Sequence, residues 1–182
     1  LKMKKNKTIS TTYLKTIEEL NNEFNWSNFS VQTPTQTVDK SHFTLIAIGN
    51  PNQEKELWSM DIKDPKYKTT EDLIYVLVIE DKIFKIGKSI TTMEKRIGSY
   101  HTGKNAYRQK ENATNSATNW FILQSVLAIN KPVYIYALYV PQTTNSFMGW
   151  TYNNRVSKEI ETLLLASFNQ KYKRNPIGNK QN

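Results

Sequence analysis

Several residues of the sequence have side chains of the types that could act together on a phosphate group. Arg96 lies one helical turn before Tyr100, so the guanidinium and the phenol could both donate to one phosphate. Glu161 could bind a divalent cation with water as the remaining ligands, and such a cation would stabilise a leaving oxygen. These residue types favour phosphodiester hydrolysis, which needs a positioned water, a neutralised phosphate and help for the leaving group.

Tyr75 is the candidate base for this hydrolysis. A phenol with its ordinary pKa of about 10 is a poor base near pH 7, and an adjacent cation favours the phenolate. We expect Lys85 to be that cation, because a second strand with Phe84 and Ile86 facing the core leaves Lys85 on the face of Tyr75. Lys88, at the end of the same strand, is a candidate phosphate contact.

The charge of the chain indicates a polyanionic partner. The 182 residues carry a formal net charge of +9, and seven cations against Glu94 alone fall between residues 85 and 110. Cations in excess of what folding needs usually meet phosphates. We therefore predict nucleic-acid contacts for four of these cations, Lys88, Lys104, Arg108 and Lys110.

The composition excludes other classes of site. The chain has no cysteine, which rules out disulfides, thiolate zinc sites and a thiol nucleophile, and its two histidines are too few for a histidine-rich metal cage. The sequence has no apolar run of membrane-spanning length and no signal-peptide pattern at its start. We expect a cytoplasmic protein that does not enter a membrane.

The elements that must position these residues form an α+β fold with a small antiparallel β-sheet flanked by helices. Apolar residues at helical spacing predict an amphipathic helix over residues 9–24. Short strands are predicted at residues 42–48, before a Gly-Asn-Pro-Asn turn, and at residues 54–61. Together they make an extension over residues 1–70.

A core over residues 71–182 follows, in the order β-β-α-α-β-α. Its first strands cover residues 74–79 and 82–87, joined by a turn at Glu80 and Asp81. A helix over residues 93–100 is expected to stop at Thr102-Gly103 and to give way to a basic loop over residues 102–119. A buried helix (120–129), a strand (133–140) and a final helix (154–168) complete the core.

The ordered motifs of this core resemble the GIY-YIG nuclease superfamily over about residues 73–179. They are Leu73-Ile74-Tyr75, Lys85-Ile86-Gly87, Arg96 with Tyr100, Glu161, and the late segment Asn175-Pro176-Ile177-Gly178-Asn179. Leu73 replaces the glycine of the family motif, and Lys85 replaces its second tyrosine, as in a subset of type II restriction enzymes. The resemblance implies that Gly87 and Asn179 support the site.

The same resemblance implies a type II restriction endonuclease, a site-specific enzyme that cuts double-stranded DNA. It implies a one-metal mechanism with Mg²⁺, or Mn²⁺, held by Glu161, and a water activated by Tyr75. Because one site cuts one strand, a palindromic target implies a homodimer. A cognate DNA methyltransferase is expected in the same system without direct contact. Residues 1–70 and 102–119 are the predicted target-recognition segments, and residues 1–70 are also expected to contribute dimer contacts.

Three alternatives remain open. The first is a basic, non-catalytic nucleic-acid-binding module on the same fold. The second is a PD-(D/E)xK nuclease that uses Glu80 and Lys82 with Asp72 or Asp64 as the further acid. The third concerns the metal ligand, because Glu159 competes with Glu161. His42 and His101 are expected at a strand edge and a helix end, with His101 as a weaker candidate for a phosphate contact.

Overall fold

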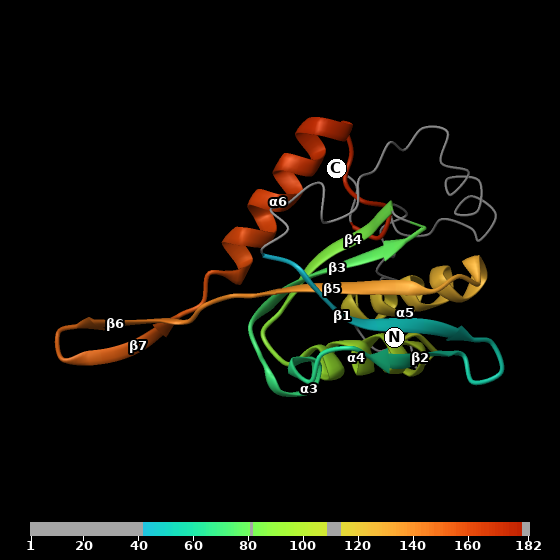
Figure 1. Ribbon diagram of the computed structural model, residues 1–182, viewed down its shortest axis with the longest axis horizontal. Coiled ribbons are helices and arrows are strands. Elements are labelled where there is room, and N and C mark those ends of the chain that lie inside the picture. The colour runs from blue at the N-terminus through green and yellow to red at the C-terminus, as the bar shows by residue number, and fades with distance from the viewer. Residues whose placement is uncertain (1–41, 81, 109–113, 180–182) are drawn as a thin grey trace, which may run out of the picture.

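The computed structural model describes residues 42–80, 82–108 and 114–179, without the side chains of residues 103–118 and 121. These residues form a five-stranded antiparallel sheet with the strand order β2-β1-β5-β3-β4 (Figure 1). The strands are β1 (Thr44–Asn52), β2 (Leu57–Ile62), β3 (Leu73–Ile79), β4 (Lys82–Ser89) and β5 (Val133–Tyr139). The predicted α+β class with a small antiparallel sheet is confirmed. The helix predicted over residues 9–24 lies outside the described residues.

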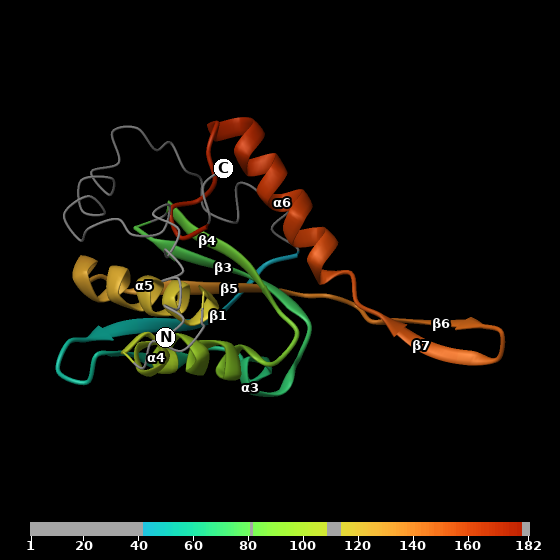
Figure 2. The same cartoon turned by 180° about the vertical axis from the view of Figure 1, so that it is seen from behind.

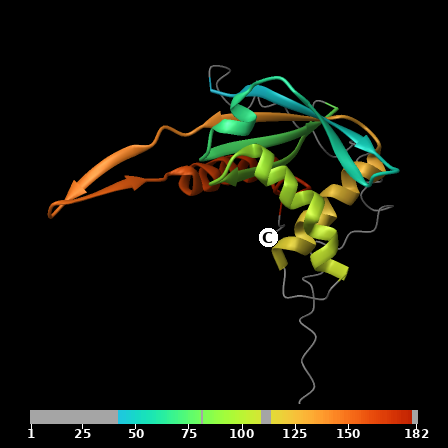
Figure 3. The ribbon, with the colours of Figure 1, turned by 90° about the horizontal axis from the view of Figure 1, so that it is seen from below.

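Helices cover both faces of the sheet. The helices α4 (Met93–Arg108) and α5 (Thr114–Ile129) lie on one face, and α6 (Ser157–Tyr172) packs on β3 and β4 from the other (Figures 2 and 3). A short helix, α3 (Lys66–Thr69), joins β2 to β3. None of the helices in the described part of the chain is long and apolar enough to cross a membrane.

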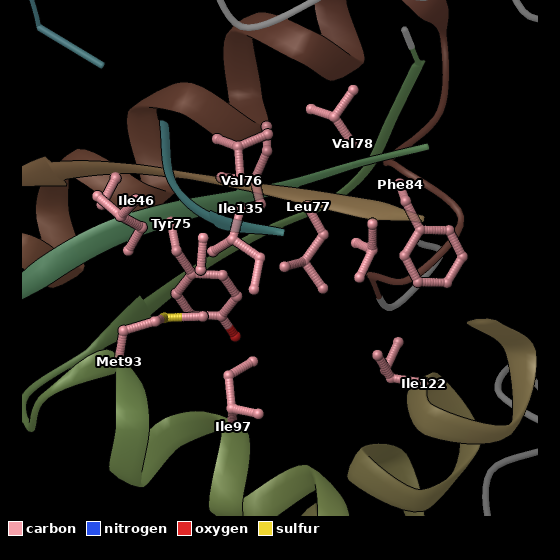
Figure 4. Close-up of a cluster of buried hydrophobic side chains, with 14 of the residues drawn as sticks. Ile46, Tyr75, Val76, Leu77, Val78, Phe84, Met93, Ile97, Ile122 and Ile135 are labelled. Carbon is pink, nitrogen blue, oxygen red and sulfur yellow. The ribbon is translucent and has the colours of Figure 1, made fainter. Parts of the chain in front are cut away.

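Strand β3 is the centre of the hydrophobic core. All seven of its residues are buried, which explains why its sequence is a continuous apolar run instead of an alternating one. Tyr75 and Leu77 point towards α4 and α5, whereas Val76 and Val78 point towards α6 (Figure 4). This strand therefore presents the Tyr75 hydroxyl to α4, which begins just after β4.

The strands of the predicted extension belong to the same sheet as the core. Strand β1 pairs with β5 along Thr44–Gly49 and with β2 along Ala47–Asn52. Strand β1 does not end at the predicted Gly-Asn-Pro-Asn turn but runs through it to Asn52, and the turn lies at residues 53–56. The strand predicted at 54–61 accordingly begins later, at Leu57.

The predicted end of α4 and the basic loop over residues 102–119 are wrong. Helix α4 continues past Gly103 to Arg108, and α5 begins at Thr114. A glycine inside a helix costs about 1 kcal/mol relative to alanine. Packing of α4 against α5 outweighs that local penalty, because most helix stability in proteins comes from tertiary contacts.

A projecting hairpin between β5 and α6 was not predicted. It consists of β6 (Thr143–Phe147) and β7 (Trp150–Asn154), joined by Met148 and Gly149. Both turn residues have positive φ, 51° and 82°, as a two-residue turn that matches the strand twist requires. The hairpin extends away from the sheet and the helices (Figures 1 and 3).

The edge of β4 is covered by the segment after α6. The side-chain amide of Asn179 pairs with the backbone of Ile86: its Nδ2 donates to the carbonyl oxygen at 2.7 Å, and its Oδ1 accepts from the amide at 2.9 Å. The amide of Gly178 donates to the carbonyl oxygen of Phe84 at 2.8 Å. These bonds satisfy backbone groups that an edge strand leaves unpaired.

The substitution Asn179→Ala tests this edge contact. We expect it to lower the free energy of unfolding by about 2–3 kcal/mol, because it leaves the buried amide and carbonyl of Ile86 unpaired. Urea unfolding measures the change. The control is Asn50→Ala on exposed β1 surface, expected to change it by less than about 0.5 kcal/mol. Equal effects of the two substitutions would contradict the assigned role of Asn179.

Candidate active site

A hydrogen-bonded cluster of two phenols and a guanidinium joins β3 to α4. The hydroxyls of Tyr75 and Tyr100 are 2.6 Å apart. Arg96 Nε donates to the Tyr75 hydroxyl at 3.1 Å, and Arg96 Nη2 donates to that of Tyr100 at 3.5 Å. The structure thus brings together three of the residues that the sequence analysis selected.

The Tyr100 phenol holds its proton firmly. Burial, followed by the neighbouring Tyr75, raises the pKa of Tyr100 well above its usual range. Tyr100 therefore keeps its proton at neutral pH, and either hydroxyl can be the donor in the bond between the two phenols. Arg96 Nε donates to the Tyr75 oxygen beside this bond, so the buried oxygen of Tyr75 has two hydrogen-bond partners.

Gly87 makes room for the Tyr75 ring. Tyr75 lies opposite Gly87 in the β3–β4 ladder, and a Cβ atom at position 87 would overlap with the Cζ and Oη atoms of Tyr75. Only glycine leaves space for the ring to cross β4 and reach α4. Gly87 therefore fixes the position of the phenol.

Lys85 is a buried cation on the same face of the hairpin as Tyr75. It pairs with Leu77, two residue pairs along the ladder from the pair of Tyr75 and Gly87, and its Nζ donates to the carbonyl oxygen of Gly178 at 2.9 Å. Burial, and next the charge of Arg96, lowers the pKa of Lys85 to about 8, although Glu161 opposes the shift. We expected Lys85 to be the cation beside the Tyr75 phenol, but the cation that hydrogen-bonds the Tyr75 hydroxyl is Arg96.

Glu161 of α6 faces the cations of this site from the other side of β4. Burial raises the pKa of its carboxyl group, while the charges of Lys85, Lys88 and Arg96 and a hydrogen bond from the backbone of Lys88 act against that rise. Glu159 lies exposed in the first turn of the same helix. Of the two competing glutamates, Glu161 is the one placed among the site residues.

The remaining candidate contact residues lie partly outside the described part of the chain or away from the tyrosine cluster. Lys104 and Arg108 lie on the last turns of α4, but their side chains, and the whole of Lys110, fall outside the described part of the chain. His101 accepts a hydrogen bond from the backbone amide of Trp58 at 3.2 Å, and burial lowers its pKa. It connects α4 to β2. His42 is exposed beside β1.

The acids of the alternative PD-(D/E)xK site are far apart. Asp72 precedes β3 and Glu80 follows it, a separation of about 26 Å along an extended strand. Glu80 forms an ion pair with Lys131, and Asp64 accepts a hydrogen bond from the amide of Lys66 at 2.8 Å. Groups of three or more His, Asp or Glu side chains that could hold a metal are absent from the described residues.

Comparison with known structures identifies the family. The structure of restriction endonuclease HPY188I in complex with product DNA matches this chain with a TM-score of 0.55 and 38% sequence identity, over 86% of this chain and 95% of that one. The chain belongs to the family of restriction endonuclease HPY188I. The predicted site-specific deoxyribonuclease is confirmed by this membership.

A more distant structure has the same fold. The endonuclease EndoII of bacteriophage T4, solved as a mutant, matches with a TM-score of 0.51 and 21% identity, over 69% of this chain and 88% of that one. No protein-family model and no curated protein sequence matched the chain. Membership in the HPY188I family therefore rests on the solved structure.

Two features of the site were not found in the sequence. The carbonyl group of Gly178 holds Lys85, and a Cβ atom on Gly178 would lie 3.0 Å from the Phe84 carbonyl oxygen and from the Phe84 and Ile122 side chains. In the sequence, Gly178 stood out only as part of the Asn175–Asn179 motif. The contact between Trp58 and Tyr100, with ring centroids 5.5 Å apart, left no sequence signal because it joins distant elements.

Gly87→Ala tests the position of Tyr75. The added methyl group displaces the ring, so we expect a loss of about 1–3 kcal/mol in the free energy of unfolding together with a loss of enzymatic activity. Gly98→Ala is the matched control, because open space surrounds position 98 in α4. Alanine there should raise stability by up to about 1 kcal/mol. Wild-type activity in Gly87→Ala would overturn the assignment.

Lys85→Met tests the burial of the lysine. The pKa of Lys85 is about 8 in the folded protein and about 10.4 in the unfolded chain, so the unfolded chain binds more protons between these values and wild-type stability rises with pH there. At pH 7 the variant should be more stable than wild type by about 1–3 kcal/mol, a difference that shrinks towards pH 10.

Urea unfolding at pH 7 and pH 10 measures this change. Lys95→Met, at an exposed position on α4, is the control and should alter stability by less than about 0.5 kcal/mol at both pH values. A destabilised Lys85→Met protein at pH 7 would show that the lysine stabilises the fold in its charged form.

Proposed function

We propose that this protein is a type II restriction endonuclease of the GIY-YIG kind that hydrolyses both strands of a specific DNA sequence in the cytoplasm. Family membership supports the reaction class, and the site geometry supports the GIY-YIG assignment. The observation that carries the proposal is that the buried hydroxyl of Tyr75 has two hydrogen-bond partners, the donating Nε of Arg96 and the hydroxyl of Tyr100. A structural tyrosine needs one partner, whereas a guanidinium donor together with a second hydroxyl suits an oxygen that becomes negatively charged.

Tyr75 is the proposed general base. Its deprotonated oxygen would take a proton from the water that attacks the phosphorus atom, and Tyr100 and Arg96 would stabilise the charge before and after transfer. Tyr75 is fully buried, whereas Arg96 is partly exposed. We therefore propose that Arg96 turns from the tyrosine towards a bound phosphate and so opens the hydroxyl to water.

Arg96 and Lys85 are the proposed phosphate-binding cations. A guanidinium donates two parallel hydrogen bonds to a phosphate, and Lys85 adds a buried charge whose field is little screened. Lys88, at the end of β4, supplies a further charge near Glu161. These cations would stabilise the additional negative charge of the transition state.

Glu161 is the proposed ligand of a divalent metal ion, Mg²⁺ or Mn²⁺. The donor set fits, because magnesium is often bound by one carboxylate with waters and substrate phosphate oxygens, and the half-buried carboxylate of Glu161 interacts electrostatically with Lys85, Lys88 and Arg96, the proposed phosphate-binding cations. When bound, the metal would stabilise the leaving oxygen. The carboxyl group must be ionised to bind it, and its raised pKa predicts weaker metal binding at mildly acidic pH than for an ordinary glutamate.

The remaining parts of the proposal concern the target. We propose that residues 1–70 and the segment around residues 102–119, including Lys104, Arg108 and Lys110, read the DNA sequence, whereas residues 71–182 form the catalytic core supported by Gly87 and Asn179. The sequence resemblance extends to a small Helicobacter pylori enzyme that cuts within TCNGA, so TCNGA is the first target to test. A homodimer would supply the two sites needed for two strands.

Cleavage of a plasmid that carries TCNGA sites, with Mg²⁺, tests the proposal. Wild type should give discrete fragments, and Tyr75→Phe and Glu161→Gln should each lower the rate by at least about 100-fold while still shifting the DNA in a gel. Tyr134→Phe, on exposed β5 surface, and Glu159→Gln, two residues before Glu161 and exposed, are the matched controls and should cleave at wild-type rates.

Other outcomes select the alternatives. An intact plasmid that nevertheless shifts in the gel, with and without Mg²⁺, would leave a non-catalytic binding module. Loss of cleavage in Glu80→Ala with full activity in Tyr75→Phe would favour the PD-(D/E)xK site, despite the separation of Asp72 and Glu80.

A further inference from the structure

Trp58 is a buried aromatic residue on an edge strand of the five-stranded sheet. Strand β2 lies at the end of the strand order, and of its six residues only Trp58 is buried. The indole packs against Tyr100, which is also fully buried, with ring centroids 5.5 Å apart and ring planes inclined at 40°. A residue of the predicted extension therefore contacts a phenol of the candidate active site.

His101 holds the backbone of the same strand. Its Nε2 accepts the hydrogen bond from the Trp58 amide at 3.2 Å, and its ring meets the indole edge-on, with centroids 6.1 Å apart. The outward amides of an edge strand have no ladder partner, so the imidazole supplies one. The buried Nε1 of Trp58 has no hydrogen-bond partner in the described part of the chain. The position of the indole therefore depends on packing and on this backbone bond.

The contact with β2 is transmitted to the phenol cluster through α4. Tyr100 and His101 are consecutive residues of this helix, and the regular helical backbone between them fixes the angle at which their side chains leave the axis. An imidazole bonded to β2 therefore constrains the direction of the Tyr100 side chain. The hydroxyl of Tyr100 lies 2.6 Å from that of Tyr75, so the same constraint acts on the distance between the two oxygens.

Tyr100 is held from more than one direction. Its ring contacts the indole of Trp58 and also the guanidinium of Arg96, whose carbon lies 4.9 Å from the ring centroid. A displacement of about 1 Å at a catalytic group costs about 100-fold in rate. Ordinary core packing would account for a buried indole, but the directed bond from β2 to the residue after Tyr100 defines an orientation as well.

We propose that His101 and Trp58 are positioning residues of the nuclease: the imidazole fixes β2 to α4, and the indole held by that bond keeps the Tyr100 hydroxyl beside that of Tyr75. Both residues act through Tyr100 and touch no reacting atom. The proposal rests on the proposed function in one respect, because the position of Tyr100 affects the cleavage rate only if the phenol pair takes part in the reaction.

Two substitutions of His101 test the hydrogen bond. His101→Leu removes the acceptor, whereas His101→Gln retains one in its side-chain carbonyl. With Mg²⁺, a plasmid that carries TCNGA sites and protein in excess over DNA, His101→Leu should cleave about 10- to 100-fold more slowly than wild type, and His101→Gln within about threefold of it. The affinity of both variants for the plasmid in a gel shift should equal that of wild type.

Ser99→Ala is the matched control on α4. Its hydroxyl donates to the carbonyl oxygen of Lys95 within the helix, so the substitution should leave the cleavage rate unchanged. Circular dichroism and the urea midpoint identify the conditions in which each variant is folded, and rates are compared there. A wild-type rate in His101→Leu would overturn the proposal. So would a lower DNA affinity of His101→Leu that accounts for all of its lost activity.

A double-mutant cycle with Tyr100→Phe separates positioning from a general effect on the fold. If His101 acts through the Tyr100 hydroxyl, adding His101→Leu to Tyr100→Phe should cause no further loss of rate. Trp58→Phe, which keeps a smaller ring, should slow the wild-type protein and likewise leave the rate of Tyr100→Phe unchanged. Losses that multiply in either cycle would contradict the proposed route through Tyr100.

A measurement without DNA tests the geometry independently of cleavage. In protein labelled with ¹³C at the tyrosine Cζ atoms, the Tyr100 resonance is identified by its absence from Tyr100→Phe. It should shift in His101→Leu, because the environment of the hydroxyl changes, and return to the wild-type position in His101→Gln. A Tyr100 resonance that His101→Leu leaves in place would show that the imidazole does not position the phenol.

The outcomes for positioning and for the proposed function are separable. If His101 positions Tyr100 but Tyr75 is not the base, Tyr75→Phe cleaves at the wild-type rate while the Tyr100 resonance still shifts in His101→Leu. If Tyr75 is the base but the positioning is wrong, Tyr75→Phe is slow, whereas His101→Leu cleaves like wild type and its Tyr100 resonance is unchanged.

Discussion

A buried hydroxyl group must have hydrogen-bond partners, and this requirement at Tyr75 determines how the sheet and α4 fit together. The ring is fully buried, and its hydroxyl meets Tyr100 and Arg96, which lie one turn apart on α4. Leaving such a group unpaired costs about 1–3 kcal/mol. The cluster thus fixes the rotation of α4 about its axis, and the absence of a side chain at Gly87 allows the ring to reach it.

A second set of contacts, at the outer edge of β4, holds the C-terminal segment against the sheet. The segment at residues 178–179 bonds to the backbone at Phe84 and Ile86, and its Gly178 carbonyl holds the ammonium group of Lys85. A buried cation between Arg96 and Glu161 destabilises the fold when charged, because burial is the main cause of its lowered pKa. Sites that carry out chemistry commonly retain such unfavourable groups at the expense of stability.

Apart from the β6–β7 hairpin, the order of elements from residue 73 onward was predictable because each of these elements has a local signal. The apolar run of β3, the Gly87 end of the β4 pattern and the helical spacing of Met93, Ile97 and Tyr100 all depend on residues close in sequence. The length of α4 was not predictable in this way. Its continuation through Gly103 depends on packing against α5, which local propensity does not report.

The candidate site residues were chosen from the sequence by type, but their contacts could not be. The pattern selected Tyr75, Lys85, Arg96, Tyr100 and Glu161, whereas the packing of α4 on β3 places Arg96 on the Tyr75 hydroxyl. Alternation of side chains along a strand predicts that Phe84 and Ile86 share one face of β4. An extra residue in β4 instead turns Phe84 towards α5, where it lies near Ile122 (Figure 4). The hairpin turn at Met148-Gly149 had a detectable signal, a glycine between two runs of Thr and aromatic residues.

The distance in sequence between the parts of the site has a consequence during protein synthesis. Glu161 and Asn179 follow Tyr75 by 86 and 104 residues, and at 5–20 residues per second the ribosome needs roughly 5–20 s to translate that interval. Until then a nascent chain carries the tyrosine hairpin without Glu161 or the segment that covers β4. On the proposed mechanism, translation that stops early therefore yields a fragment that has the tyrosine hairpin but not the proposed metal ligand.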